Sequence, residues 1–330
     1  MSLAIIAVIV LALLASFLNG IHDSSNVVAT MISSRAFSPR TALNTTAVAE
    51  FSGPLIFGVA VAKTIGNDFV VADTINIRVI LAALVSAILW NLLTWYLGLP
   101  SSSSHALVGG LIGSVVMGAG WQAIQLHGIE TILIALFISP IVGFVFGYLI
   151  LRLILLLSWN ATPRLNGFFK RGQMFSAVAL ALSHGANDGS KTMGIITLAL
   201  IIEGYMKDFR VPVWVILICA GAMALGTGLG GMRLIRTVGG KFYKIRPVDG
   251  FASQMASAIV ILGASLLGGP VSTTQVVSSS IMGVGAAGRV NKVRWKVAQD
   301  LGTAWLLTIP ASALVAAGLY WLFRLVIHQA

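Results

Sequence analysis

The amino-acid sequence predicts an all-α polytopic membrane protein that consists of two inverted-topology repeats, with interrupted helices and re-entrant helical hairpins. Three observations lead to this prediction: the composition, a succession of long apolar segments, and a set of motifs that occurs twice. Of the 330 residues, 57% are hydrophobic and 9% are charged, whereas about 25% of the residues of a soluble domain are charged. Such a composition is typical of a chain that lies largely in lipid.

Apolar segments follow one another along the chain. At least eight of them exceed about 18 residues, the length that crosses a hydrocarbon core about 30 Å thick. The first runs directly into a polar motif and lacks a basic leading region and a small-residue cleavage site, so we interpret it as a retained helix. The single cysteine, Cys219, excludes a disulfide framework and a cysteine-based metal site. The segments begin near Leu3, Ala42, Ile77, Glu130, Met174, Val211, Phe251 and Val297.

Four landmarks occur twice in the same order, the second copy lying roughly 170 residues after the first. They are GIHDSSN at 20–26 and GANDGSK at 185–191, KTIG at 63–66 and RTVG at 236–239, GLPSSSSH at 98–105 and GGPVSTTQ at 268–275, and ISP and TIP ending at Pro140 and Pro310. This order predicts a first repeat over 1–157, a cytoplasmic linker over 158–173 and a second repeat over 174–330.

Each repeat contains an interrupted helix, a second helix, a two-armed unit folded about the Ser/Thr run, and a last long helix. Counting the arms separately gives five segments, and an odd number inverts the second repeat relative to the first, as in many secondary transporters. The arms after the runs, from His105 and from Gln275, have roughly 15 residues and a length of about 22 Å. This length favours re-entrant hairpins with tips near mid-membrane.

The net charge of +11 comes from short loops between apolar segments rather than from one patch, so we expect no nucleic-acid partner. Lys and Arg collect in cytoplasmic loops of membrane proteins, which predicts a multi-pass plasma-membrane protein with its N-terminus outside. In this orientation the charges of the outer loops sum to zero. The first loop has Lys63, Asp68, Asp73 and Arg78, and the second has Glu203, Lys207, Asp208 and Arg210. The inner loops hold Arg35, Arg40, Arg164, Lys170, Arg171, the basic residues from Arg233 to Arg246, Arg289, Lys292, Arg294 and Lys296.

The two Ser/Thr runs have the chemistry of an anion site. Each follows a proline and starts a helix, where unpaired N–H groups and the positive end of the helix dipole suit an oxyanion. The alternative is that the hydroxyls only cap their own helices. A matched pair in inverted repeats favours a shared anion site formed by Ser102, Ser103, Ser104, Ser272, Thr273 and Thr274.

The GIHDSSN and GANDGSK motifs place ionisable side chains within apolar segments, where such residues are costly and usually functional. Glycines at 20, 185 and 189 allow the helix to unwind there. Carboxylate, amide and carbonyl oxygens suit a small cation, and the same carboxylates suit a proton; a solvent-facing loop between two shorter helices is the alternative. The polar residues of the motifs are Asp23, Asn26, Asn187, Asp188 and Lys191.

Glu50 is a further ionisable residue within an apolar segment, with no counterpart in the second repeat. It is either a proton or cation site or the partner of a basic residue such as Lys191. The histidines next to the motifs match no zinc spacing, so we expect them to be hydrogen-bonding groups of a cavity wall. They are His22, His105 and His184.

The paired motifs GIHDSSN and GANDGSK, together with GLPSSSSH and GGPVSTTQ, resemble the duplicated signatures of the inorganic phosphate transporter (Pit) family. The resemblance extends over both repeats and indicates a short member without a large central insertion. It implies a secondary active transporter, not an enzyme, that imports inorganic phosphate with Na+ or H+ by alternating access. The expected partners are phosphate, the coupling ion, the lipid bilayer and, as an option, a second copy of the chain; no cofactor is expected.

The resemblance implies that phosphate is held between the hairpin tips, with Lys191 beside it, and that the coupling cation lies near the two motifs. Asp23, Asn26, Asn187 and Asp188 become cation or phosphate ligands, and Glu50 a coupling residue; Asp23, Asn26 and Asp188 are the metal ligands if the ion is Na+. Two positions depart from the pattern: His22 stands where longer members tend to have Asn, and Lys191 stands where the first repeat has Asn26. Lys191 either replaces a sodium ion or pairs directly with phosphate.

Other functions remain as alternatives. A permease for sulfate or another tetrahedral oxyanion is one, although phosphate keeps a proton that it can donate to Asp23 or Asp188 and sulfate does not, so a site with these acceptors should reject sulfate. A passive anion channel is another. A membrane-embedded enzyme of phosphoryl or phosphatidyl transfer is less favoured, because the acids are spread over different segments.

Overall fold

The structure is a computed structural model that describes residues 2–98, 101–159, 165–230 and 245–327. RTVG at 236–239, Pro100, and the expected linker residues 160–164 lie outside the described residues. Apart from one isolated bridge between Val70 and Ile124, the described secondary structure is helical, which confirms the all-helical prediction.

The first part of the chain forms a long helix, a bent pair, a helical hairpin and a second long helix. These are α1 (Leu3–Ser33), α2 (Pro39–Phe57), α3 (Ala60–Lys63) continued by the π-helical η1 (Thr64–Asp68), α4 (Ile77–Leu97), α5 (Ser103–Ala119) and α6 (Leu126–Leu157), with short 3-10 turns η2 (Ala72–Thr74) and η3 (Trp121–Ala123).

The second part has a parallel order. Its elements are α7 (Leu165–His184), the π-helical η4 (Gly185–Gly189), α8 (Ser190–Ile202), α9 (Val213–Leu229), α11 (Pro247–Leu266), α12 (Thr273–Gly288), the 3-10 turn η5 (Val290–Lys292) and α13 (Trp295–Ile327). Because α7 begins at Leu165, the second half of the expected linker is helical.

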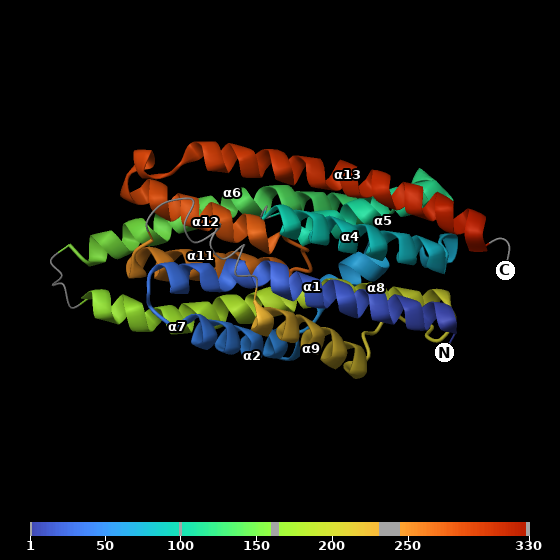
Figure 1. The fold of residues 1–330 in the computed structure, drawn as a ribbon, viewed down its shortest axis with the longest axis horizontal. Coiled ribbons are helices and arrows are strands. Elements are labelled where there is room, and N and C mark those ends of the chain that lie inside the picture. The colour runs from blue at the N-terminus through green and yellow to red at the C-terminus, as the bar shows by residue number, and fades with distance from the viewer. Residues whose placement is uncertain (1, 99–100, 160–164, 231–244, 328–330) are drawn as a thin grey trace.

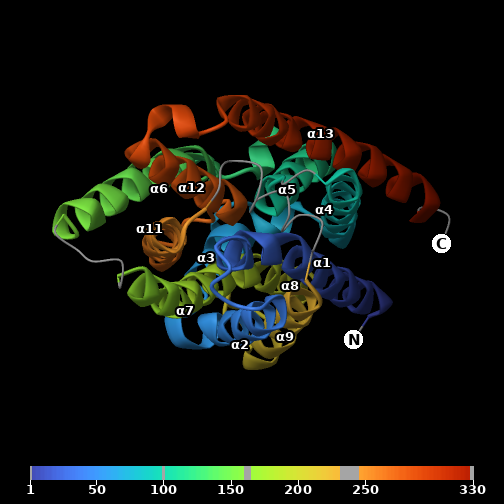
Figure 2. The same cartoon turned by 60° about the vertical axis from the view of Figure 1, so that its left-hand side comes forward.

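The helices form an elongated bundle in which the two helical hairpins occupy opposite halves (Figure 1). The hairpin of α4 and α5 lies in the right half of the view and that of α11 and α12 in the left half. Where the two hairpins meet, the hydroxyl of Ser104 in α5 donates to the Val271 carbonyl before α12 at 3.0 Å. Helix α5 packs against α13 and α12 packs against α6, an arrangement that can be followed in Figure 2. Each hairpin is therefore held by the last long helix of the other part of the chain.

Five described helices are long and apolar enough to cross a membrane: α1, α4, α6, α11 and the portion 298–325 of α13. A sixth span is possible if α2 and the segment Ala60–Asp68, bent by 74°, count as one. The estimate of at least eight spanning segments is thus too high for the described residues. Gly58, with φ of 78°, ends α2, η4 divides the segment near Met174, and α9 has only 17 residues.

The first motif is not an interruption, contrary to the expectation from its glycine and polar residues. Helix α1 continues through it for 31 residues, and the hydroxyls of Ser24 and Ser25 donate to the carbonyls of Ile21 and His22 at 2.8 and 3.1 Å, within the same helix. The second motif does depart from the α-helix, as the π-helical turn η4. Both motifs are buried, so neither is a solvent-facing loop.

Gly20 and Gly185 of the motifs, with Gly226 and Gly53 of the facing helices, allow close helix packing. A Cβ atom on Gly20 of α1 or on Gly226 of α9 would overlap the backbone of the facing helix, and the same holds for Gly185 of η4 and Gly53 of α2. Two glycine pairs therefore join α1 to α9 and η4 to α2 at backbone contact.

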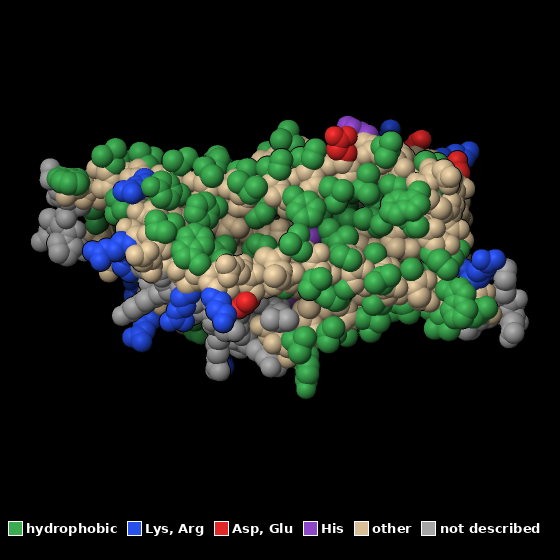
Figure 3. Space-filling model, turned by 90° about the horizontal axis from the view of Figure 1, so that it is seen from above, with side chains coloured by type: hydrophobic (Ala, Val, Ile, Leu, Met, Phe, Trp, Pro, Cys, Tyr) green, Lys and Arg blue, Asp and Glu red, His purple; other side chains and the backbone are tan. Residues whose placement is uncertain are grey.

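Charged side chains are unequally distributed over the two ends of the bundle. Figure 3 shows Lys and Arg gathered at the left end, whereas Asp and Glu accompany basic residues toward the right end. Both termini lie toward the right end in Figure 1. The basic end therefore carries the loop from α1 to α2 and the loop from α12 to α13.

Candidate functional site

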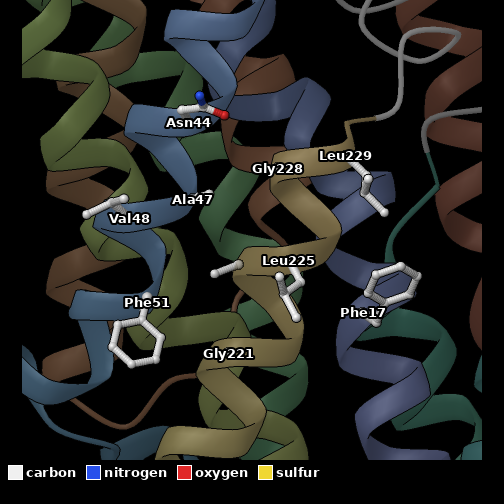
Figure 4. A pocket seen from close by; sticks show the side chains of 10 residues that line it. Phe17, Asn44, Ala47, Val48, Phe51, Gly221, Leu225, Gly228 and Leu229 are labelled. Atoms are coloured by element: carbon white, nitrogen blue, oxygen red, sulfur yellow. The ribbon is translucent and has the colours of Figure 1, made fainter.

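A large surface hollow has none of the described polar motif residues in its wall. It has a volume of about 970 Å³ and lies between α1, α2 and α9 (Figure 4). Among its described lining residues, which include Phe17, Phe51 and Leu225, Asn44 is the one polar side chain. A wall of this kind offers nothing to neutralise an anion, and in a membrane protein it suits acyl chains.

The polar groups of the motifs and the hairpin tips meet in the interior instead. We call this set the central cluster; all its members except Ser103, which is half-buried, are buried. It brings together residues from α1, α5, α7, η4, α8 and α12. Its members are Asn19, Asp23, Asn26, Ser103, Ser104, His184, Asp188, Lys191, Thr273 and Thr274.

Asp23 in α1 is surrounded by hydrogen-bond donors. Its Oδ1 accepts from the Thr274 hydroxyl at 2.9 Å and from the Asn26 amide at 2.8 Å, and its Oδ2 accepts from the Ser103 hydroxyl at 3.2 Å. The same Asn26 amide also donates to Thr274 Oγ1 at 3.0 Å. Asp23 thus contacts both hairpin tips, one through Ser103 and the other through Thr274.

Asp188 in η4 has a similar shell. Its Oδ2 accepts from the Thr273 hydroxyl at 2.9 Å and lies 3.5 Å from the Asn19 amide, while its Oδ1 accepts from Lys191. A buried charge needs this kind of compensation, because an uncompensated one costs several kcal/mol. The two aspartates are therefore held as charges by hydroxyl, amide and ammonium donors.

Lys191 in α8 uses its three ammonium donors. It donates to Asp188 Oδ1, to Ser104 Oγ, and to the main-chain carbonyl of Val271 at 2.8 Å. A lysine ammonium has three donors and no acceptor, so the group is saturated. Lys191 pairs with Asp188 and not with Glu50, which removes Lys191 as the basic partner considered for Glu50.

Glu50 in α2 pairs with His184. The distance between His184 Nδ1 and Glu50 Oε1 is 2.8 Å, and the Thr227 hydroxyl donates to Glu50 Oε2. The other ring nitrogen of His184 lies 3.3 Å from Asp188 Oδ2 and 3.8 Å from Asp23 Oδ2. Asp23, His184 and Asp188 offer ligand atoms within 4.8 Å of one another, a spacing at which one small cation can be held.

In each Ser/Thr run, the first of three hydroxyl residues caps the following helix, and the next two contact the motifs. The Ser102 hydroxyl accepts from the main-chain N–H of His105 at 3.1 Å, and the Ser272 hydroxyl accepts from that of Gln275 at 3.4 Å. Ser102 and Ser272 are therefore helix caps, while the next two residues of each run face the central cluster. His105 and Gln275, at matching places of the two runs, lie 3.3 Å apart through their Nε2 atoms.

Asn187 lies outside the central cluster. Its amide donates to the Ser265 hydroxyl at 2.9 Å and to the Gly269 carbonyl at 3.1 Å, so it fastens the second hairpin. Asn19 and Thr227, by contrast, contact the acidic residues although the motifs did not single them out. Asn19 precedes Asp23 by one helical turn, a spacing that places both on one helix face.

A cavity of about 30 Å³ borders the cluster, with Asn19, Asn91, Ser103, Asp188 and Lys191 in its wall. This cavity is small beside the surface hollow of about 970 Å³. In the described conformation the polar groups of the central cluster are hydrogen-bonded mainly to one another.

An all-helical chain with several membrane spans that buries carboxylates, an ammonium group and two helix starts together is a membrane transporter by class. The family model described as "Phosphate transporter family" matches residues 19–316. The chain belongs to this family, which consists of transporters and not of enzymes, as the sequence motifs indicated.

Two relatives and one solved structure resemble the chain over nearly its full length. A protein of Bacillus subtilis named "Probable low-affinity inorganic phosphate transporter" is 43% identical over 325 residues, 97% of each chain. One of the same name from Rhizobium meliloti is 42% identical over 98% of this chain and 97% of its own. A structure titled "The sodium-dependent phosphate transporter" superimposes with a TM-score of 0.92 at 24% identity, covering 98% of this chain and 100% of the other. At that identity it shows a shared fold.

Proposed function

We propose that the protein imports inorganic phosphate across the plasma membrane by symport with Na+ or H+, through alternating access. Its membership of the phosphate transporter family and the names of its relatives support phosphate as the substrate. The observation that carries the proposal is the convergence of two helix starts on two buried carboxylates, through Ser103, Thr273 and Thr274.

In this proposal phosphate binds between the tips formed by Ser102, Ser103, Ser104, Ser272, Thr273 and Thr274. Two helix N-termini then face one anion, and hydroxyls beside them donate to its oxygens. In the described conformation the same hydroxyls donate to Asp23 and Asp188. Phosphate takes over these donors, and its own O–H donates a hydrogen bond to one of the carboxylates, while Lys191 contributes positive charge through its contact with Ser104.

The coupling cation binds at Asp23, Asn26 and Asp188 in this proposal, with Asn187 and Glu50 supporting it. Asn26 Oδ1 is buried and, among the described residues, has no hydrogen-bond partner, so it is a ready ligand next to the Asp23 carboxylate. Asn187 Oδ1 is unpartnered in the same way, at the second hairpin. Glu50 acts through His184, because His184 and Thr227 already take its oxygens.

The proposal includes two inverted repeats, 1–157 and 174–330, joined by the linker 158–173. Support comes from matched packing: α5 lies against α13 as α12 lies against α6, and the glycine contact of α1 with α9 corresponds to that of η4 with α2. The contact between His105 and Gln275 fits a pseudo-twofold axis through the tips. Orientation with the N-terminus outside follows from the basic end in Figure 3 and the positive-inside rule.

We also propose that α4 with α5, and α11 with α12, enter and leave on the same side. Helices α5 and α12 have 17 and 16 residues, about 26 and 24 Å at 1.5 Å per residue, less than the hydrocarbon thickness of about 30 Å. The described non-helical residues of the tips, such as Ser101, Ser102 and Val271, are buried, and non-helical backbone is tolerated at that depth when it is buried in protein.

Alternating access follows from the charges. The bound cation offsets the charge of the carboxylates, and the helix N-termini and Lys191 offset the charge of phosphate, so that the loaded site needs less water and can close. The repeats then exchange outward and inward conformations around the loaded site.

The test is uptake of inorganic phosphate into proteoliposomes under imposed sodium, proton or no gradients. The proposal expects concentrative uptake with one of the cation gradients and none without. Flux that ignores both gradients would indicate a channel, and product formation without flux would indicate an enzyme. Equal uptake of sulfate and phosphate would assign the protein to a general oxyanion permease.

A further inference from the structure

The polar motifs of the two repeats make equivalent contacts with the tips. Ser103 donates to Asp23 at 3.2 Å, and Thr273 at the matching place donates to Asp188 at 2.9 Å. The next hydroxyl of each tip contacts the other repeat: Thr274 lies 3.0 Å from the Asn26 amide nitrogen, and Ser104 lies against Lys191. The Lys191 side chain therefore occupies the position that the Asn26 side chain occupies in the first repeat.

The surroundings of the Lys191 ammonium are those of a bound cation. Its three contacts are a carboxylate oxygen of Asp188, a hydroxyl oxygen of Ser104 and the carbonyl oxygen of Val271, from three different elements. Hard cations take the same classes of oxygen ligand. The side chain is 5% exposed, so the charge is enclosed as an occluded ion would be.

The first repeat has comparable oxygen ligands, but within the described residues it has no lysine ammonium beside them. Asn26 Oδ1 is buried and unpartnered among the described residues, and it stands beside the carboxylate of Asp23. The ion-pair contacts of Asp23 there are with His22 and His184, at 3.3 and 3.8 Å. Asp188 forms an ion pair with Lys191. Within the described ranges, no lysine or arginine forms an ion pair with Asp23.

We propose that the Lys191 ammonium is a tethered cation that permanently fills the second-repeat counterpart of the coupling site, so that a mobile cation binds only on the side of Asp23 and Asn26. The proposal rests on the symport proposed above and deepens it. It settles the two roles considered for Lys191: the ammonium replaces an ion and acts on phosphate through Ser104. Replacing Lys191 by asparagine, the residue at the matching place of the first repeat, therefore creates a second site for a mobile cation.

The decisive variant is Lys191→Asn, which gives the second motif the Asp–Asn pair of the first. The number of cations carried per phosphate is measured in proteoliposomes with a fixed phosphate gradient. The cation gradient at which net phosphate flux is zero gives this ratio. We expect the ratio to rise by about one in Lys191→Asn, since one fixed charge becomes one mobile charge. Lys207→Asn, an exposed lysine in the loop from α8 to α9, is the control with an unchanged ratio.

If the Lys191→Asn protein transports phosphate with an unchanged number of cations per phosphate, the tethered-cation proposal is wrong, whereas the proposed phosphate symport stands. Absence of gradient-driven uptake by the wild type instead overturns the proposed function. If Lys191→Asn protein does not transport, its thermal unfolding is measured with increasing Na+ and at decreasing pH, beside Lys191→Met, which lacks a side-chain oxygen ligand. Stabilisation of the Asn variant alone by either cation supports the proposal, and equal responses of the two variants refute it.

Discussion

Thr274→Val is the substitution that probes the contact between the second tip and the first motif most selectively. The Thr274 hydroxyl donates to Asp23 at 2.9 Å and accepts from Asn26 at 3.0 Å, and valine keeps the shape while removing both bonds. In the phosphate-bound state valine would leave a buried phosphate oxygen without this donor; a buried polar group left without its partner costs about 1–3 kcal/mol, which corresponds to roughly 5- to 150-fold in an equilibrium constant. Because phosphate would use the same hydroxyl, we expect the KM for phosphate to rise within that range.

The assay is initial uptake of phosphate into proteoliposomes as a function of its concentration. Thr197→Val is the matched control, because the buried Thr197 hydroxyl donates to the Met193 carbonyl within α8 at 2.8 Å and, among the described residues, forms no hydrogen bond with the central cluster. A KM for Thr274→Val no higher than that of Thr197→Val would refute the assignment of Thr274 to the phosphate site.

Three further predictions follow from the same contacts. Asp23→Asn and Asp188→Asn should each abolish gradient-driven uptake while the protein elutes as folded protein in size-exclusion chromatography; wild-type uptake by both would remove these carboxylates from coupling. Gly20→Ala should lower the thermal unfolding midpoint, because overpacking typically costs about 1–3 kcal/mol, whereas Gly221→Ala, which meets no neighbouring atom within 4 Å, should not; equal midpoints would contradict the close packing of α1 on α9. Sulfate at the concentration of phosphate should leave phosphate uptake unchanged, and strong competition would show that proton donation does not select the substrate.

The helical class and the burial of both motifs could be predicted from the sequence, because apolar length and isolated acidic residues report directly on the lipid environment. The matching order of the Ser/Thr runs likewise predicted that Ser103 and Thr273 would lie in comparable surroundings. The sequence also predicted the family, because the order and the composition of the paired motifs are together specific for it.

Other features depend on packing between distant segments and were missed or wrong. A glycine before a polar motif permits unwinding or close helix contact, and only the position of α9 shows that Gly20 serves contact. The partner of Glu50 is His184 because α2 lies against η4 and α7, a neighbour relation that one sequence does not contain. The division of each run into a cap and contact residues depends in the same way on where the opposite motif lies.

The most direct test of the central claim is an experimental structure of the protein in a lipid environment with bound phosphate. The account predicts density for one tetrahedral anion between the two hairpin tips, within hydrogen-bond distance of Ser103 or Ser104 on one side and of Thr273 or Thr274 on the other. Phosphate bound elsewhere, with these hydroxyls still donating to Asp23 and Asp188, would contradict the account.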